Sequence, residues 1–166
     1  MPYRMSSRVT DFGDLDDVDR GILHLLQEDA RNTATFIGDQ VGVSATTVTN
    51  RIEQLEDAGI VRGYHVDIDY EQAGLPLRVL FVCSAPPTDR PSFAERALGI
   101  KGVVNVRQLL GGERNVHVVA VAETTSEIES VTSDLHDIGF QVVSSVIMHH
   151  EAVQPWNHFY VEESEE

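Results

Sequence analysis

A run of small polar residues, Ser44 to Arg51, carries the side chains whose chemistry is easiest to interpret. The run reads Ser-Ala-Thr-Thr-Val-Thr-Asn-Arg. Thr and Asn side chains can hydrogen-bond base edges or phosphates, and a Thr methyl can touch a thymine methyl. Because Asn can form two hydrogen bonds with adenine, Asn50 is the best single candidate for a base contact. The alternative is a merely solvated helix face.

Eight polar residues on or near this run are the expected DNA contacts. They are Arg31, Ser44, Thr46, Thr47, Thr49, Asn50, Arg51 and Arg62. Arg31 and Arg62 are expected to bind phosphates, whereas Ser44 is also a good helix N-cap. Arg51 has a structural alternative, an ion pair with Glu28, Glu56 or a neighbour. Arg4 and Arg8, near the N-terminus, are further candidates for DNA contact.

Three helices are expected to position this run. Apolar residues at helical spacing predict a first helix from Leu15. A second helix begins after Asn32 or Thr33 and stops at Gly42, and a third is capped by Ser44 and ends at Ala58-Gly59. The short turn between the second and third helices predicts a helix-turn-helix. Gly38, inside the second helix, would let the third helix cross closely.

Two further parts follow these helices. Alternating apolar residues at Tyr64, Val66 and Ile68 predict a strand, either a wing or a linker. The remainder predicts a ferredoxin-like order of strand, helix, strand, strand, helix, strand. The expected bounds are 77–85, 92–98, 103–110, 116–122, 126–138 and 142–149. The fold class is therefore α+β, a winged helix-turn-helix followed by a βαββαβ domain.

These elements imply five segments. They are an N-terminal arm (1–14), a winged helix-turn-helix (15–63), a linker strand (64–74), a ferredoxin-like domain (75–153) and an acidic tail (154–166).

The net charge of −15 is unexpected for a protein that binds phosphates. Only Lys101 is lysine among the 12 basic residues, a pattern typical of proteins from a high-salt cytoplasm. Screening at molar salt would suppress the resulting repulsion. With no apolar run long enough to span a bilayer and no secretory signal at the start, we expect a cytoplasmic protein that does not enter membranes.

Metal binding is a weaker possibility. Cys83, His117 and His149 are available as ligands, but no spacing motif joins them. We therefore expect no metal and no cofactor, and structural or surface roles for these side chains.

The first third of the chain resembles the Lrp/AsnC family of prokaryotic transcription regulators. The matching segments are Leu15–Leu23, Leu26–Arg31, Val41–Ser44, Thr46–Val48, Arg51–Ile52, Leu55–Val61 and Gly63–Tyr64. The element order of residues 77–151 also agrees. Together with the composition, this indicates a family member from a halophilic archaeon.

The resemblance implies several partners. Family members bind pseudo-palindromic double-stranded DNA and form dimers through their ferredoxin-like sheets, and often assemble into tetramers or octamers. Many sense amino acids or other small molecules at interfaces between C-terminal domains.

The resemblance also places an effector site at the turn that contains Gly111, Gly112, Arg114 and Asn115. The family's turn commonly reads Gly-x-x-Asp, and Asn115 stands where Asp is usual if Gly112 is the matching glycine. Because Asn carries no charge to oppose an ammonium group, ordinary amino-acid sensing is in doubt. Arg114 would instead suit an anionic ligand, and a plain hairpin turn is the alternative.

Three classes of function remain. The favoured one is a sequence-specific transcription regulator with an effector, and a metal-responsive regulator is a variant of it. A DNA-architectural protein without an effector is the second. An enzyme is the least supported, because the sequence has no nucleophile–base pair, phosphate loop or acid pair.

Overall fold

The computed structural model describes residues 15–86, 90–149 and 151–152. Contacts between Cα atoms divide these residues into two compact units, 15–66 and 67–152. Arg4 and Arg8, together with the rest of the predicted arm and the predicted acidic tail, lie outside the described residues.

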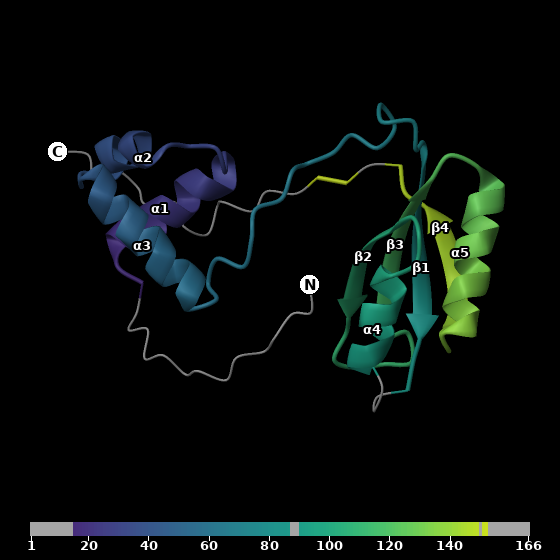
Figure 1. Ribbon diagram of the computed structural model, residues 1–166. Helices are drawn as coiled ribbons and strands as arrows, with labels where there is room; N and C mark the ends of the chain where they lie inside the picture. Colours follow the sequence, from purple (N-terminus) through teal and green to yellow (C-terminus); the bar gives the residue numbers. More distant parts are fainter. Residues whose placement is uncertain (1–14, 87–89, 150, 153–166) are drawn as a thin grey trace. The chain divides into compact units, whose positions relative to one another are not determined.

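The first unit contains α1 (Asp17–Glu28), α2 (Ala34–Val41) and α3 (Ala45–Asp57), shown in purple to blue in Figure 1. Each helix begins at a side chain that caps its free backbone N–H groups: Asp16, Thr33 and Ser44, respectively. The caps of α2 and α3 confirm the predicted starts, whereas α1 begins two residues after the predicted Leu15. The apolar faces of all three helices meet in one small core. It consists of Ile22, Leu23, Ile37, Val48 and Leu55.

The turn between α2 and α3 depends on two glycines. Gly42 ends α2 with a φ of 76°, a left-handed conformation that glycine adopts without steric cost. Gly38 is buried inside α2, and a Cβ atom on it would lie 2.5 Å from the carbonyl oxygen of Val43. The predicted close crossing at Gly38 is therefore confirmed.

The predicted strand at 64–69 is absent. Residues 62–69 are neither helix nor strand, and the side chain of Val66 is 82% exposed. A strand needs a hydrogen-bonded neighbour, and the described residues of this chain offer none to this segment. The alternation of apolar residues was therefore not enough to predict a wing or a linker strand.

The second unit contains β1 (Leu77–Ser84), α4 (Arg90–Leu98), β2 (Val103–Gln108), β3 (Val116–Ala122), α5 (Thr125–Asp137) and β4 (Gln141–Ile147). This confirms the predicted βαββαβ order. The sheet is antiparallel with strand order β2-β3-β1-β4. The strands predicted at 103–110 and 142–149 each extend two residues beyond the observed ends of β2 and β4.

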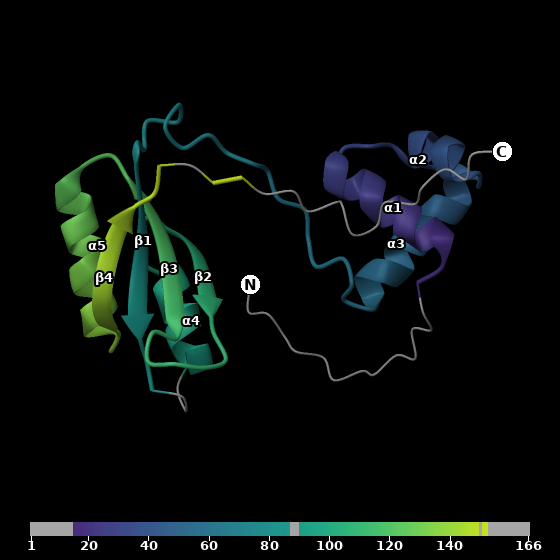
Figure 2. The same cartoon turned by 180° about the vertical axis from the view of Figure 1, so that it is seen from behind.

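Both helices of this unit pack on the same face of the sheet, as Figures 1 and 2 show from opposite sides. Phe81, Cys83 and Val118 point from the central strands into this layer. They meet Phe93 of α4 and Leu135 of α5, and all five side chains are buried. The loops at the sheet's ends are thereby held on a rigid platform.

Candidate DNA-reading helix and effector turn

The exposed face of α3 carries the polar residues that the sequence singled out. At 3.6 residues per turn, positions i, i+4 and i+7 share one face of a helix. Val48, Ile52 and Leu55 form the face that packs on the core. Thr46, Asn50 and Glu53 have the same spacing on the opposite face, and all three are exposed. We call these three residues the outward stripe of α3.

The hydroxyls beside the stripe are already engaged. Ser44 Oγ accepts a hydrogen bond from the backbone N–H of Thr47 at 3.1 Å and lies 2.9 Å from Thr47 Oγ1. Thr49 Oγ1 donates to the carbonyl oxygen of Ala45 at 3.1 Å. Thr46 and Asn50, in contrast, have no hydrogen-bond partner within the part of the chain that the structure describes. Among the predicted residues on α3, Thr46 and Asn50 are the ones whose polar atoms are free to meet a partner.

Arg51 is held by two carboxylates at the start of α1. Its Nη2 lies 3.0 Å from Asp16 Oδ2, and its Nη1 lies 3.2 Å from Asp19 Oδ1. The side chain of Asp19 is only 5% exposed, whereas that of Arg51 is 35% exposed. An ion pair was anticipated as the structural alternative for Arg51, but with Glu28, Glu56 or a neighbour and not with these two residues.

Asp16 and Asp19 also cap α1. Each side chain accepts a hydrogen bond from the other residue's backbone N–H, which makes a reciprocal capping box. The hydrogen bond from the backbone N–H of Asp19 lowers the pKa of Asp16; burial opposes this shift, and the charge of Arg51 adds to it. This cluster was not predicted from the sequence. The Asp-x-x-Asp spacing signals the cap, but nothing local signals Arg51, 32 residues from Asp19.

The other two predicted phosphate contacts are accessible. Arg31 lies just before α2 with its side chain 91% exposed, and its Nε is 3.5 Å from the carboxylate of Asp29. Arg62 follows α3 and is exposed.

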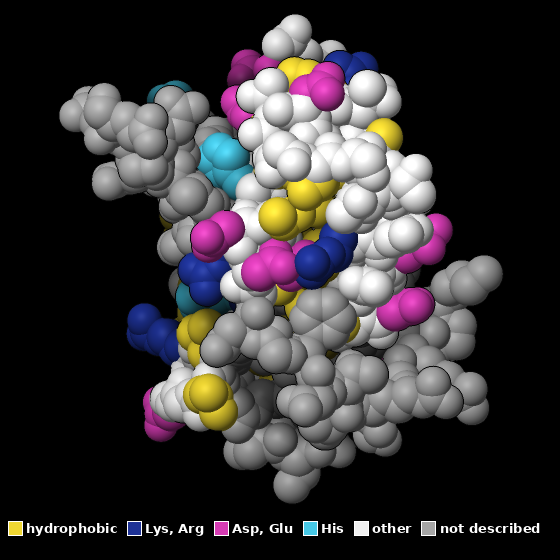
Figure 3. Space-filling view, turned by 90° about the vertical axis from the view of Figure 1, so that its left-hand side faces the viewer, with side chains coloured by type: hydrophobic (Ala, Val, Ile, Leu, Met, Phe, Trp, Pro, Cys, Tyr) yellow, Lys and Arg dark blue, Asp and Glu magenta, His cyan; other side chains and the backbone are white. Residues whose placement is uncertain are grey.

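Acidic residues outnumber basic ones in the first unit: residues 15–66 contain nine Asp and Glu but four Arg. On the face drawn in Figure 3, basic side chains are scattered, and most have an acidic side chain beside them. This unit therefore offers little long-range attraction to a polyanion.

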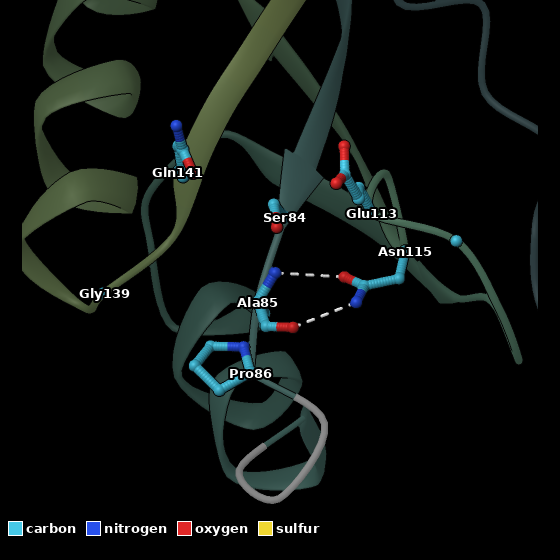
Figure 4. Close-up of a pocket in the computed structure, with 8 residues that line it drawn as sticks. Ser84, Ala85, Pro86, Glu113, Asn115, Gly139 and Gln141 are labelled. Carbon is cyan, nitrogen blue, oxygen red and sulfur yellow. Dashed lines mark hydrogen bonds between the residues drawn. The ribbon is translucent and has the colours of Figure 1, made fainter.

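The turn between β2 and β3 borders an open cavity of about 490 Å³ at one end of the sheet. Figure 4 shows the cavity between the end of β1, this turn and the start of β4. The lining residues are Ser84, Ala85, Pro86, Gly112, Glu113, Asn115, Gly139 and Gln141. Gly112 and Asn115 of the predicted effector set line it, whereas Gly111 and Arg114 are exposed beside it.

Both the oxygen and the nitrogen of the Asn115 side chain hydrogen-bond to the backbone (Figure 4). Its Oδ1 accepts a hydrogen bond from the N–H of Ala85 at 3.0 Å, and its Nδ2 donates to the carbonyl oxygen of Ala85 at 2.9 Å. The residue is 5% exposed. The amide therefore ties the end of β1 to the β2–β3 turn. The charged side chain among the cavity's lining residues is Glu113, which sequence reasoning did not select.

The candidate metal ligands do not converge. Cys83 pairs with Val116 and His117 pairs with Val82, so neighbouring strands place the two side chains on opposite faces of the sheet. His149 is exposed beyond the end of β4. Burial raises the pKa of Cys83 to about 11, which disfavours the thiolate. Within the described ranges, no three His, Cys, Asp or Glu side chains are grouped to hold a metal ion.

A second cluster of charged side chains joins β1, β2 and the segment after β4. It was not predicted from the sequence. Glu151 contacts Arg78 and also lies 3.5 Å from Arg107. Residues 73 and 44 positions apart in the chain cannot be paired from local pattern.

Comparisons with known proteins agree with this architecture. Residues 15–56 match the AsnC-type helix-turn-helix domain. The chain is 32% identical over 144 residues to the HTH-type transcriptional regulator AldR of Mycobacterium tuberculosis, covering 82% of this chain and 79% of that protein. It is 29% identical to the regulator LrpA of Pyrococcus horikoshii, covering 72% and 84% of the two chains.

Solved structures give the same result. The crystal structure of the M. tuberculosis AldR has a TM-score of 0.72 and 29% identity, covering 84% of this chain and 97% of that one. A transcriptional regulator of Neisseria meningitidis, solved as a complex with L-Met, has a TM-score of 0.72 and 28% identity, covering 89% and 100%.

The chain therefore belongs to the Lrp/AsnC family and is a DNA-binding transcription regulator of that type. None of the helices in the described residues has the length and apolar character needed to cross a membrane.

Proposed function

We propose that this regulator reads specific DNA sites by inserting the outward stripe of α3 into the major groove. The observation that carries this proposal is the contrast within α3. The side chains of Thr46 and Asn50 are exposed and have no hydrogen-bond partner within the described residues. The hydroxyls of Thr47 and Thr49, in contrast, are hydrogen-bonded to Ser44 and to the carbonyl oxygen of Ala45, respectively. Asn50 is placed to recognise adenine through two hydrogen bonds.

The remaining residues of the predicted set have supporting roles. The N-terminus of α3 at Ser44 offers backbone N–H groups to a phosphate. Arg31 and Arg62, both exposed, bind phosphates and fix the register of α3 on the duplex. Arg51 has only part of its guanidinium free for a phosphate, because two carboxylates already hold it.

We also propose a small-molecule effector at the cavity beside Gly112. A solved relative carries L-Met in its complex, and in this chain the β2–β3 turn opens onto a cavity with Glu113 in its lining. Asn115 shapes the site through Ala85, and Arg114 lies outside the lining. Metal is not needed for this proposal.

We also propose an oligomeric state, a cellular location and a source organism for the protein. It acts as a homodimer or a larger assembly in the cytoplasm, on two half-sites related by symmetry. Its acidic, lysine-poor composition fits a halophilic archaeon. Light scattering of the purified protein at molar KCl measures the oligomeric state directly, and a monomer would contradict this part.

Genome-wide capture of bound DNA in the native cells tests the central proposal. We expect a palindromic motif near promoters for the wild type and its loss in Asn50→Ala. Gln27→Ala, an exposed amide in α1, is the matched control and should retain the motif. Uniform coverage of the genome by the wild type would instead support an architectural role.

A further inference from the structure

We infer that Glu53 is a specificity-determining residue that accepts a hydrogen bond from the 4-amino group of a cytosine in the major groove. The inference rests on the proposed DNA-reading role of α3. Glu53 is exposed on the outward stripe, one turn beyond Asn50. The three-residue rise from Asn50 to Glu53 is about 4.5 Å, between one and two base steps of roughly 3.4 Å, so the two side chains can address neighbouring base pairs.

The carboxylate of Glu53 is available for such a contact. No ion pair or hydrogen bond to another described side chain holds it, in contrast to Glu56, whose Oε1 accepts a hydrogen bond from Tyr64 at 2.8 Å. The one basic residue of α3 is Arg51, and it is bound to Asp16 and Asp19. Glu53 therefore forms no ion pair with the basic residue of its own helix.

The chemistry of the stripe selects the base edges that it can accept. Guanine presents the acceptors N7 and O6 in the major groove, and these are read by Arg or Lys, which the stripe lacks. Thymine presents the acceptor O4, which would repel a carboxylate. Only adenine and cytosine present amino donors there, and cytosine is the base that an acidic side chain reads. Asn50 takes adenine, because an amide can donate to N7 while it accepts from N6.

Repulsion is the competing explanation, in which Glu53 only weakens contact with phosphates. The two explanations differ in what removal of the charge does. Loss of a base contact changes which sequence is preferred, whereas loss of repulsion raises affinity for every sequence.

Selection of bound duplexes from a random pool at molar KCl, with the purified full-length protein, separates these outcomes. We compare the wild type with Glu53→Gln and with Glu28→Gln, which removes the same charge from an exposed site on α1. The wild type should select cytosine at one position of each half-site, next to an adenine. Glu53→Gln should lose that preference by roughly 5- to 100-fold and favour adenine, which Gln reads. Glu28→Gln should keep the wild-type motif.

Two results would overturn the inference, and they are distinguishable. If Glu53→Gln retains the motif and only binds all duplexes more tightly, Glu53 acts by repulsion. If the wild type selects no motif, the DNA-reading role of α3 fails, and the inference fails with it. At molar KCl, where repulsion between surface carboxylates is screened, the thermal midpoint of each variant should equal that of the wild type, since both residues are exposed. Any loss of preference is then a change in recognition.

Discussion

Arg51 is the single residue that most clearly serves the fold of the first unit. Its guanidinium joins α3 to the first turn of α1 through Asp16 and Asp19. Asp19 is nearly buried, and Arg51 is the cation that faces it. A buried carboxylate without a partner is costly, so the arginine stabilises the position of α3 against α1.

We predict that Arg51→Ala lowers the free energy of unfolding by about 1–3 kcal/mol, the usual cost of leaving a buried hydrogen-bonding group unsatisfied. Urea denaturation measures this loss. Arg51→Ala combined with Asp19→Asn should lose less stability than the two separate effects added together, because the interaction is shared.

The salt dependence of DNA affinity then distinguishes positioning from direct contact. A lost phosphate contact would reduce the slope of log affinity against log salt by about one. If Arg51→Ala reduces the slope and leaves stability unchanged, Arg51 is a phosphate contact and the positioning role is wrong.

Helices and strands were predictable from the sequence where their signals were local. Helix starts were predictable from caps such as Thr33 and Ser44, and the α2–α3 crossing from Gly38. The strand at 64–69 was wrong because pairing depends on a neighbour that local alternation cannot report.

The contacts of individual side chains were harder to predict than the positions of helices and strands. Asn115 was selected by its place in the turn, but its partner Ala85 lies 30 residues away and takes both hydrogen-bonding groups of the amide. Cys83 and His117 lie on paired strands, yet the register puts them on opposite faces of the sheet. Such details require the tertiary structure.

The two hydrogen bonds between the Asn115 side chain and the Ala85 backbone make the link between β1 and the β2–β3 turn testable. Asp in this place can accept from the N–H of Ala85 but cannot donate to its carbonyl oxygen, and an ionised carboxylate would face that oxygen. We predict that Asn115→Asp destabilises the protein by about 1–3 kcal/mol at pH 7. Thermal unfolding at several pH values measures the change.

The pH dependence supplies the control for this substitution. A protonated Asp regains one donor, so the loss should shrink toward about pH 4 and grow as pH rises above it. Asn115→Ala, which has no charge, should lose stability by an amount that varies less with pH. Equal losses for the two variants at every pH would contradict the two-bond account of Asn115.

Across the whole chain, acidic residues far outnumber basic ones. The chain has 27 acidic and 12 basic residues and a net charge of −15. Few of the acidic groups are paired within the described residues, and the pairs seen include exposed ones such as Lys101 with Glu127 at 3.7 Å. Exposed ion pairs contribute little to the free energy of unfolding. Mutual repulsion of the unpaired carboxylates therefore opposes the compact state.

Salt should relieve this repulsion. The screening length falls from about 10 Å at 0.1 M salt to about 3 Å at 1 M, so charges on opposite sides of a unit cease to interact. We predict that the urea midpoint of unfolding rises steeply between 0.1 and 1 M KCl and more gradually above that. Sucrose is the matched control, because it stabilises compact states by exclusion and does not screen charge. A midpoint that is independent of KCl, or that rises equally with sucrose, would show that the acidic surface does not limit stability. DNA affinity should then also be measured in dilute buffer, since the reason for expecting misleading results there would be gone.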